Sequence, residues 1–139
     1  MALPEAGQLS PLSEAQMEIM NFLWDQGEAT VGEVWKALSA RRAVARNTVL
    51  TMIVRLQERG WLHCESRGHA FRYRATAPRE VAQGMMVRRL LDSAFGGSAE
   101  GLALALLDGH GLTADESKRI RSMIQRAEDS RAKTRGGKP

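Results

Sequence analysis

The hydrophobic period changes within residues 45–75, ARNTVLTMIVRLQERGWLHCESRGHAFRYRA, and this change indicates the fold class. Over 45–59 the apolar residues recur at helical spacing and form one inward stripe. After Gly60 the period becomes two, and apolar residues alternate with arginine near the end of the stretch. We therefore predict a helix over 45–59 followed by a β-hairpin over 61–75. The inward stripe of the helix consists of Ala45, Val49, Met52, Ile53 and Leu56.

Two further helices precede this stretch, and each begins with a capping box. Ser13 and Gln16 have the spacing of such a box, and Thr30 and Glu33 repeat it. Gly27 is placed to end the first of these helices. Three helices followed by a hairpin make the winged helix-turn-helix plan, in which the third helix enters the DNA major groove and the hairpin is the wing.

The positive charge of the chain is concentrated in the same region. The 139 residues carry a formal net charge of only +4. Residues 41–89 contain eleven arginines and three acidic residues, a net charge of +8, whereas residues 1–40 carry −5. The guanidinium fork suits phosphate groups and guanine edges, although a basic surface can also be merely a solvated face. The positive charge of residues 41–89 coincides with the predicted reading helix and wing, and this coincidence favours DNA binding.

We predict DNA contacts from the outer face of helix 45–59, from the start of the second helix and from the hairpin. Residues in the first turns of helix 45–59 are placed to contact bases and phosphates, and Arg55, farther along, to hold a phosphate. Thr30 suits either a helix cap alone or a cap that also meets a phosphate. The predicted DNA-binding residues are Thr30, Arg46, Asn47, Thr48, Leu50, Thr51, Arg55, Arg67, His69 and Arg72.

Three more segments with apolar stripes follow residue 77, where a winged domain closes its core. The segment 99–107 is apolar nearly all round, and a single chain has too few partners to cover it. We therefore predict a homodimer built from these helices, a symmetry that suits a pseudo-palindromic operator. The expected domains are 1–77 for DNA binding, 78–132 for dimerisation and 133–139 as a basic flexible tail. The predicted dimer contacts are Met85, Leu90, Leu102, Leu106, Leu107, Ile120, Met123 and Ile124.

Four stretches resemble the penicillinase-repressor family of the BlaI/MecI type. The resemblance runs from about Leu12 to about Glu128 and is most specific from Thr48 through the hairpin. It implies a dimeric transcriptional repressor that binds double-stranded operator DNA, and a membrane sensor protease that inactivates it by cleavage in the C-terminal region. The stretches are LSEAQMEIMNFLW from Leu12, ATVGEVWKAL from Ala29, NTVLTMIVRLQERGWL from Asn47 and RGHAFRYRA from Arg67.

The chain departs from the family pattern at three places. Ala105-Leu106 stands where the best-known members carry the Asn-Phe cleavage pair, which argues against cleavage with the same specificity. Leu50 replaces a polar or basic base-reading residue, so we expect a different operator, with a thymine methyl group against Leu50. The cysteine cluster of the copper-responsive branch has no counterpart, because Cys64 is the only cysteine.

Other function classes find little support in the sequence. There is no Ser/His/Asp grouping, paired carboxylate site or phosphate-binding glycine loop, so we expect no enzyme activity. One cysteine and three histidines argue against a metal or another cofactor. With no membrane-spanning apolar run or signal peptide, we expect a cytoplasmic protein without membrane insertion. Two alternatives stay open: a MarR-like regulator with a ligand pocket at the dimer junction, and a winged-helix protein-interaction module that does not bind DNA.

Overall fold

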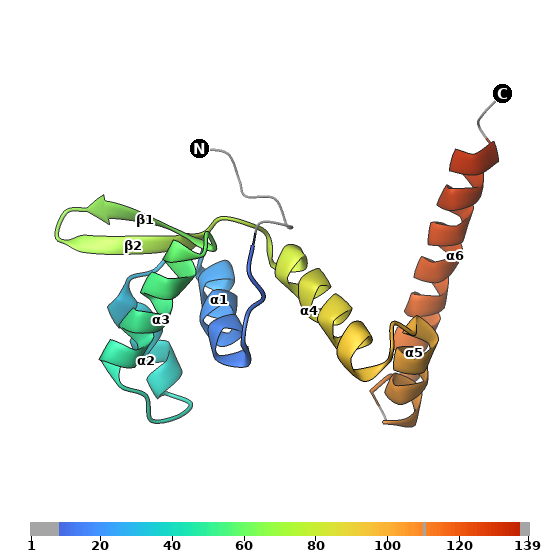
Figure 1. Ribbon diagram of the computed structural model, residues 1–139, viewed down its shortest axis with the longest axis horizontal. Coiled ribbons are helices and arrows are strands. Elements are labelled where there is room, and N and C mark those ends of the chain that lie inside the picture. The colour runs from blue at the N-terminus through green and yellow to red at the C-terminus, as the bar shows by residue number, and fades with distance from the viewer. Residues whose placement is uncertain (1–8, 110, 137–139) are drawn as a thin grey trace. The chain divides into compact units, whose positions relative to one another are not determined.

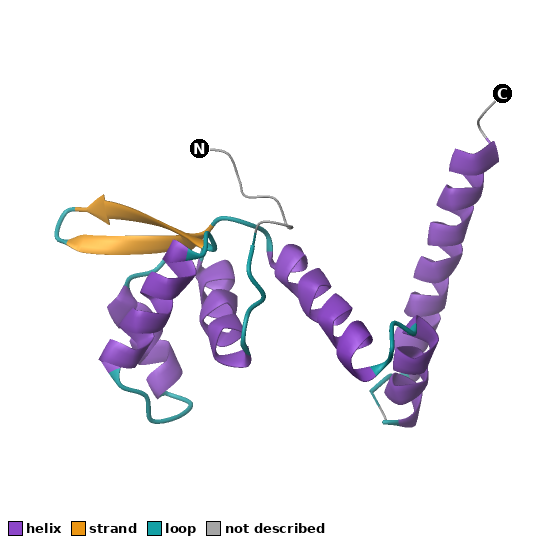
Figure 2. Ribbon diagram, in the orientation of Figure 1, coloured by secondary structure: helices purple, strands orange, loops and turns teal. Residues whose placement is uncertain are grey.

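The computed structural model describes residues 9–109 and 111–136, and it consists mainly of helices with one antiparallel hairpin (Figure 1). Among the described residues, three helices precede the hairpin and three follow it (Figure 2), which confirms the predicted fold class. The described residues divide into two compact units between Leu90 and Leu91. The elements are α1 (Glu14–Gln26), α2 (Val31–Ser39), α3 (Arg46–Glu58), β1 (Leu62–Arg67), β2 (Ala70–Ala75), α4 (Arg79–Ala94), α5 (Ala99–Asp108) and α6 (Ala114–Gly136).

Local hydrogen bonds begin and end the first helices as the sequence predicts. The Ser13 hydroxyl accepts from the Gln16 backbone amide, and the Gln16 side chain accepts from the Ser13 amide. Thr30 and Glu33 form the same reciprocal pair at the start of α2. Gly27 ends α1 with a φ of 86°, in the left-handed region that favours glycine.

The core of the first unit lies between α1, α2, α3 and the base of the hairpin. The inner stripe of α3 is confirmed at three positions, because Val49, Ile53 and Leu56 are fully buried. Met52 is partly buried against the same core, whereas Ala45 is exposed as the N-cap residue of α3. The largest fully buried side chains are Trp61, Ile19, Met20, Leu23, Ile53, Leu56, Val34 and Val49.

The three tryptophans connect segments outside the helices and strands to this core through hydrogen bonds of their indole groups. Each indole N–H donates to a backbone carbonyl that no helix or strand satisfies: Trp24 to Ala77, Trp35 to Val44, and Trp61 to Ser10. These bonds reach across 53, 9 and 51 residues respectively. Burying an aromatic ring with its polar group satisfied stabilises the core and fixes the chain around it.

The hairpin is joined to the helices through Tyr73. In the register of the two strands, Cys64 lies opposite Tyr73 and Arg67 lies opposite Ala70. The backbone of Tyr73 also exchanges two hydrogen bonds with Ala29, in the segment just before α2. The Tyr73 side chain is 6% exposed, so the base of the hairpin belongs to the core while its turn extends beyond it.

The first part of α4 belongs to the first unit. Ala82 is buried in the core, and Val81 and Met85 pack against it. For this reason the boundary between the compact units follows Leu90, later than the domain end at residue 77 that the sequence suggests. Met85, predicted for a dimer contact, already has part of its surface covered within its own chain.

The second unit contains the end of α4 with α5 and α6. The Ser98 hydroxyl accepts from the Gly101 amide at the start of α5, and Thr113 and Glu116 form a capping box before α6. Helix α6 continues to Gly136, so the prediction of a flexible tail from residue 133 is wrong for 133–136. The helix persists there because it contains neither proline nor a stop before the last glycines. The rest of the predicted tail, 137–139, lies outside the described residues.

No single helix among the described residues is long and apolar enough to cross a membrane. Helices α4 and α5 taken together, with a bend between them, meet the criteria of length and composition.

Candidate nucleic-acid interface

The outer face of α3 is open to solvent at every position predicted to contact DNA. Asn47, Thr48 and Thr51 are exposed, and the Leu50 side chain is 41% exposed although it is apolar. The Thr51 hydroxyl donates to the carbonyl oxygen of Asn47 at 2.9 Å. Its remaining lone pair can accept a hydrogen bond from a base, which keeps Thr51 available for DNA.

The arginines of α3 differ from those of the hairpin in their partners. Within the described residues, Arg46 and Arg55 form no ion pair or hydrogen bond through their side chains, and the same holds for Arg59 just after α3. Arg67, Arg72 and Arg74 of the hairpin are all paired with carboxylates. Among the described residues, three of the first unit's cationic side chains without a carboxylate partner, Arg46, Arg55 and Arg59, thus lie on α3 and at its C-terminal end.

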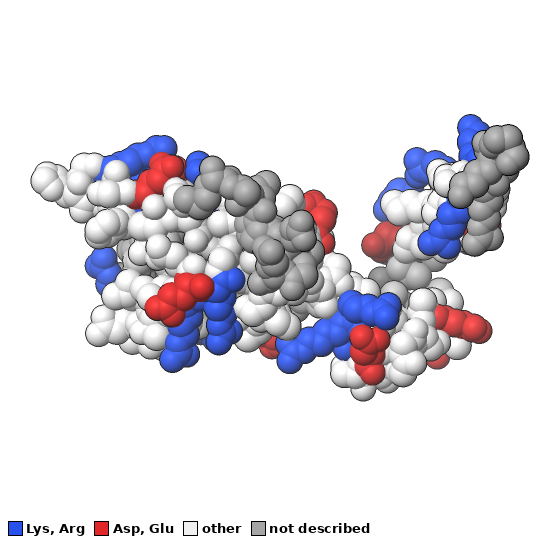
Figure 3. Space-filling view, turned by 45° about the horizontal axis from the view of Figure 1, so that its top comes forward, with Lys and Arg blue, Asp and Glu red and all other residues white. Residues whose placement is uncertain are grey.

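Acidic residues near the start of α2 hold the hairpin arginines. The Arg72 guanidinium contacts Glu28 at 2.9 Å and Glu33 at 3.2 Å, and Arg67 contacts the same Glu28 oxygen at 3.0 Å. Within the hairpin, Glu65 pairs with both Arg67 and Arg74 at 3.5 Å. In the space-filling view of Figure 3, basic and acidic side chains lie beside one another on the face in view.

These ion pairs are weak enough to exchange for phosphate contacts. Partly exposed pairs contribute about 0.2–1 kcal/mol each, because water and salt screen them. Arg67 is 59% exposed and can turn toward DNA at small cost, whereas Arg72 is only 28% exposed and has two carboxylate partners. Both arginines can be recognised from the sequence, whereas Glu28 cannot, because its role depends on contacts 39 and 44 residues away.

Thr30 is confirmed as the cap of α2. Its hydroxyl oxygen accepts from the Glu33 amide at 3.1 Å, and its own amide donates to the Glu33 carboxylate. The hydrogen bond from the Thr30 backbone is the largest cause that lowers the pKa of Glu33; burial opposes it, and the Thr30 hydroxyl and Arg72 add to the lowering. The hydroxyl proton of Thr30 can still be donated to a phosphate.

The structure brings four of the predicted DNA-binding residues to one groove between α2, α3 and the hairpin. Thr30, Arg46, Leu50 and His69 line this groove, which has a volume of about 380 Å³. A Cβ atom placed on Gly32 would lie 3.5 Å from the Arg46 guanidinium, so that side chain rests on the first turn of α2. The other lining residues are Val31, Gly32, Ala70, Phe71 and Tyr73.

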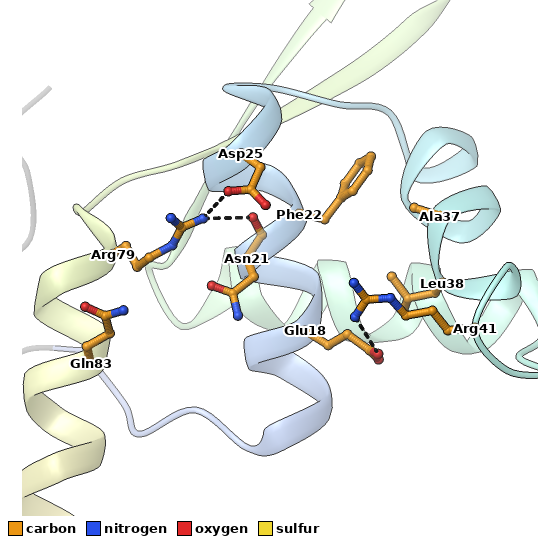
Figure 4. Close-up of a pocket in the computed structure, with 9 residues that line it drawn as sticks. All are labelled: Glu18, Asn21, Phe22, Asp25, Ala37, Leu38, Arg41, Arg79 and Gln83. Atoms are coloured by element: carbon orange, nitrogen blue, oxygen red, sulfur yellow. Dashed lines mark hydrogen bonds and ion pairs between the residues drawn. The ribbon is translucent and has the colours of Figure 1, made fainter. Parts of the chain in front are cut away.

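A second cavity, of about 500 Å³, lies between α1, α2 and the start of α4 (Figure 4). Its charged side chains face one another: Arg79 contacts Asp25 and the carbonyl oxygen of Asn21, and Arg41 faces Glu18 at 3.9 Å. The Arg79 guanidinium also lies over the Trp24 ring, 5.6 Å from its centre. The Arg79 contacts tie α4 to α1, and the Arg41–Glu18 contact ties the segment after α2 to α1, which gives the charges of this cavity a structural role.

Residues that could bind a metal are scattered. Within the described part of the chain, no three His, Cys, Asp or Glu side chains come together in a group that could hold an ion. Cys64 is partly buried beside Tyr73, and burial followed by the hydrogen bond to Cys64 raises the pKa of Tyr73. The His63 ring lies 3.5 Å from Glu65 in the same hairpin.

Three helices ahead of a hairpin, with a polar and basic helix face beside it, define a DNA-binding protein of the winged helix-turn-helix class. The family model described as penicillinase repressor matches residues 12–126. The chain belongs to this family, the BlaI/MecI type, whose members are DNA-binding transcriptional repressors and not enzymes.

Individual relatives cover most of the chain. The transcriptional regulator BlaI of Mycobacterium tuberculosis (strain ATCC 25618 / H37Rv) is 31% identical over 123 residues, which are 87% of this chain and 88% of that protein. The penicillinase repressor of Bacillus licheniformis is 22% identical over 118 residues, covering 85% and 92% of the two chains. The solution structure of monomeric Bacillus licheniformis BlaI with the blaP half-operator aligns with a TM-score of 0.46 and 26% identity, over 58% of this chain and 90% of that chain.

Proposed function

We propose that the protein is a dimeric repressor that binds a pseudo-palindromic operator, with α3 in the major groove and the hairpin as the wing. The observation that carries this proposal is the outer face of α3. It combines small polar side chains with the unpaired guanidinium groups of Arg46 and Arg55. Small polar residues allow a helix to lie close to base edges, and arginine binds phosphate or guanine.

Exposed apolar side chains support the dimer. In the second unit, Leu107 is 58% exposed and Met123 is 56% exposed. A single chain that leaves this much apolar surface in water is prone to association, which a twofold interface satisfies with a defined partner. Six of the predicted dimer contacts are among the exposed apolar side chains, namely Leu90, Leu106, Leu107, Ile120, Met123 and Ile124, and Leu102 is half-buried.

Dimerisation also gives the repressor a route to release. When two α3 helices are held in one dimer, the entropy cost of binding DNA is incurred once for two half-sites. Separating the two chains therefore weakens binding at each half-site. We propose that a membrane sensor protease acting on α5 would release the operator in this way. Ala105 and Leu106 are exposed in the single chain, but they lie within the helix, and cleavage there requires local unfolding.

The deciding experiment is duplex selection with the full-length chain. Sequences enriched from a random pool are expected to contain two related half-sites about 34 Å apart or a multiple of that distance. Affinity for the selected operator should exceed affinity for a scrambled duplex of the same composition. Failure to bind any duplex at low salt would refute the proposal and leave a winged-helix interaction module as the better description.

A further inference from the structure

Phe71 has an exposure that the fold does not explain. It lies in β2 near the turn and is 61% exposed, more than any other large apolar side chain described. Tyr73, two residues along the same strand and therefore on the same face, is buried. The apolar face of the hairpin continues past the core and leaves the Phe71 ring in water. Such a surface is a mark of a contact with another molecule.

The surroundings of Phe71 combine apolar walls with positive charge. Phe71, Leu50 and Val31 line the groove between α2, α3 and the hairpin, together with Arg46 and His69. No carboxylate of the described residues lines this groove, in contrast to the cavity between α1, α2 and α4. Arg46 has no acidic partner among the described residues. A ligand that suits these walls is anionic and presents apolar C–H groups next to its charges.

We propose that this groove holds the sugar-phosphate backbone of one DNA strand, with Phe71 against the deoxyribose ring and Arg46 on a phosphate. The inference rests on the proposed function. With α3 in the major groove and the wing over the adjacent minor groove, a backbone strand separates the two and passes between them. The lining residues come from these two elements and from the start of α2.

The contact of Phe71 has two properties that distinguish it from the other contacts. It is independent of sequence, because every nucleotide presents the same sugar. It also releases no counterion, because the phenyl ring is uncharged, whereas a phosphate contact from Arg46 contributes to the salt dependence of binding. Phe71 thus acts as an apolar clamp that strengthens binding without changing the choice of operator.

The test measures binding of the full-length chain to two labelled duplexes of equal length across a range of salt concentrations. One duplex contains only G·C pairs and has no thymine methyl groups, and the other has mixed sequence. Phe71→Ala is expected to weaken binding to both duplexes about tenfold, with an unchanged salt slope. Phe71→Leu keeps an apolar group and should lose less. Arg46→Gln should weaken binding and reduce the slope by about one unit.

Each other outcome overturns the inference. Wild-type affinity for Phe71→Ala would show that the ring does not touch DNA, and a loss confined to the mixed duplex would show that it meets a thymine methyl group. A changed salt slope for Phe71→Ala would also contradict an uncharged contact. If the wild-type chain binds neither duplex, the proposed function itself fails. Thermal unfolding of both Phe71 variants serves as the folding control, since an exposed ring contributes little to the core.

Discussion

The hydroxyl group of Thr51 is already engaged within α3, because it donates to the carbonyl oxygen of Asn47. Any base that it reads must therefore donate to its lone pair, which selects an amino group of adenine or cytosine. Thr51→Val keeps the shape and removes the oxygen. We expect it to weaken binding to the selected operator by about 1–3 kcal/mol, with a smaller effect on a scrambled duplex.

Thr51→Ser is the matched control, because it keeps the oxygen and removes only the methyl group. It should bind the operator more tightly than Thr51→Val. Equal losses on the operator and the scrambled duplex for Thr51→Val would mean that α3 does not read a base at this position.

At the scale of elements, the hairpin is distinguished by arginines that can bind either carboxylates of the protein or phosphates of DNA. Glu28 holds Arg67 and Arg72 in the free protein, and phosphates would hold them in a complex. We expect Arg67→Gln to weaken binding to all duplexes and to flatten the salt dependence by about one unit. Glu28→Gln should have the opposite effect on affinity, because it removes the carboxylate that Arg67 and Arg72 share and leaves each of them with one weaker partner, Glu65 or Glu33. Salt titrations of the three proteins measure this directly.

If the salt dependence of DNA binding were unchanged in Arg67→Gln and in Arg72→Gln, neither arginine would contact a phosphate, and both would have a structural role only. Their part would then be to fasten the wing to the start of α2 through Glu28 and Glu33. In that case Glu28→Gln should lower the free energy of unfolding without raising DNA affinity.

Helix α4 contributes to the stability of the winged unit through its first turns. A chain ending at Ala77 loses the buried Ala82, the packing of Val81 and Met85, and the contact of Arg79 with Asp25. A chain ending at Leu90 keeps them. We expect the shorter chain to be less stable by roughly 2–4 kcal/mol in urea unfolding, given the apolar area lost. If the two chains had the same urea midpoint and the same dependence of the free energy of unfolding on urea, α4 would be dispensable for the stability of this unit.

At the scale of the whole molecule, the exposed apolar stripe of α6 determines the expected assembly. Light scattering of the full-length protein should give twice the mass of one chain. Met123→Glu places a charge in the stripe and should shift the equilibrium toward the monomer and weaken operator binding. Ser122→Glu is the matched control, because Ser122 lies on the opposite side of the same helix.

A monodisperse wild-type monomer at micromolar concentration would contradict the dimer. If Met123→Glu and Ser122→Glu behaved alike in mass and in operator affinity, the interface would not involve α6. Retained operator affinity in a monomeric Met123→Glu variant would separate dimerisation from DNA binding.

Local patterns in the sequence are sufficient to predict the helices, the hairpin and the polar face of α3. Capping boxes such as Ser13 with Gln16 join residues three apart, and hydrophobic period is likewise a local property. Which arginines have carboxylate partners depends on contacts between distant segments, because Arg72 meets Glu28 and Glu33 across 44 and 39 residues. Only the tertiary structure decided that the apolar face of β2 runs beyond the core. Alternation places Phe71 and Tyr73 on one face, but how far the helices cover that face depends on packing between distant segments.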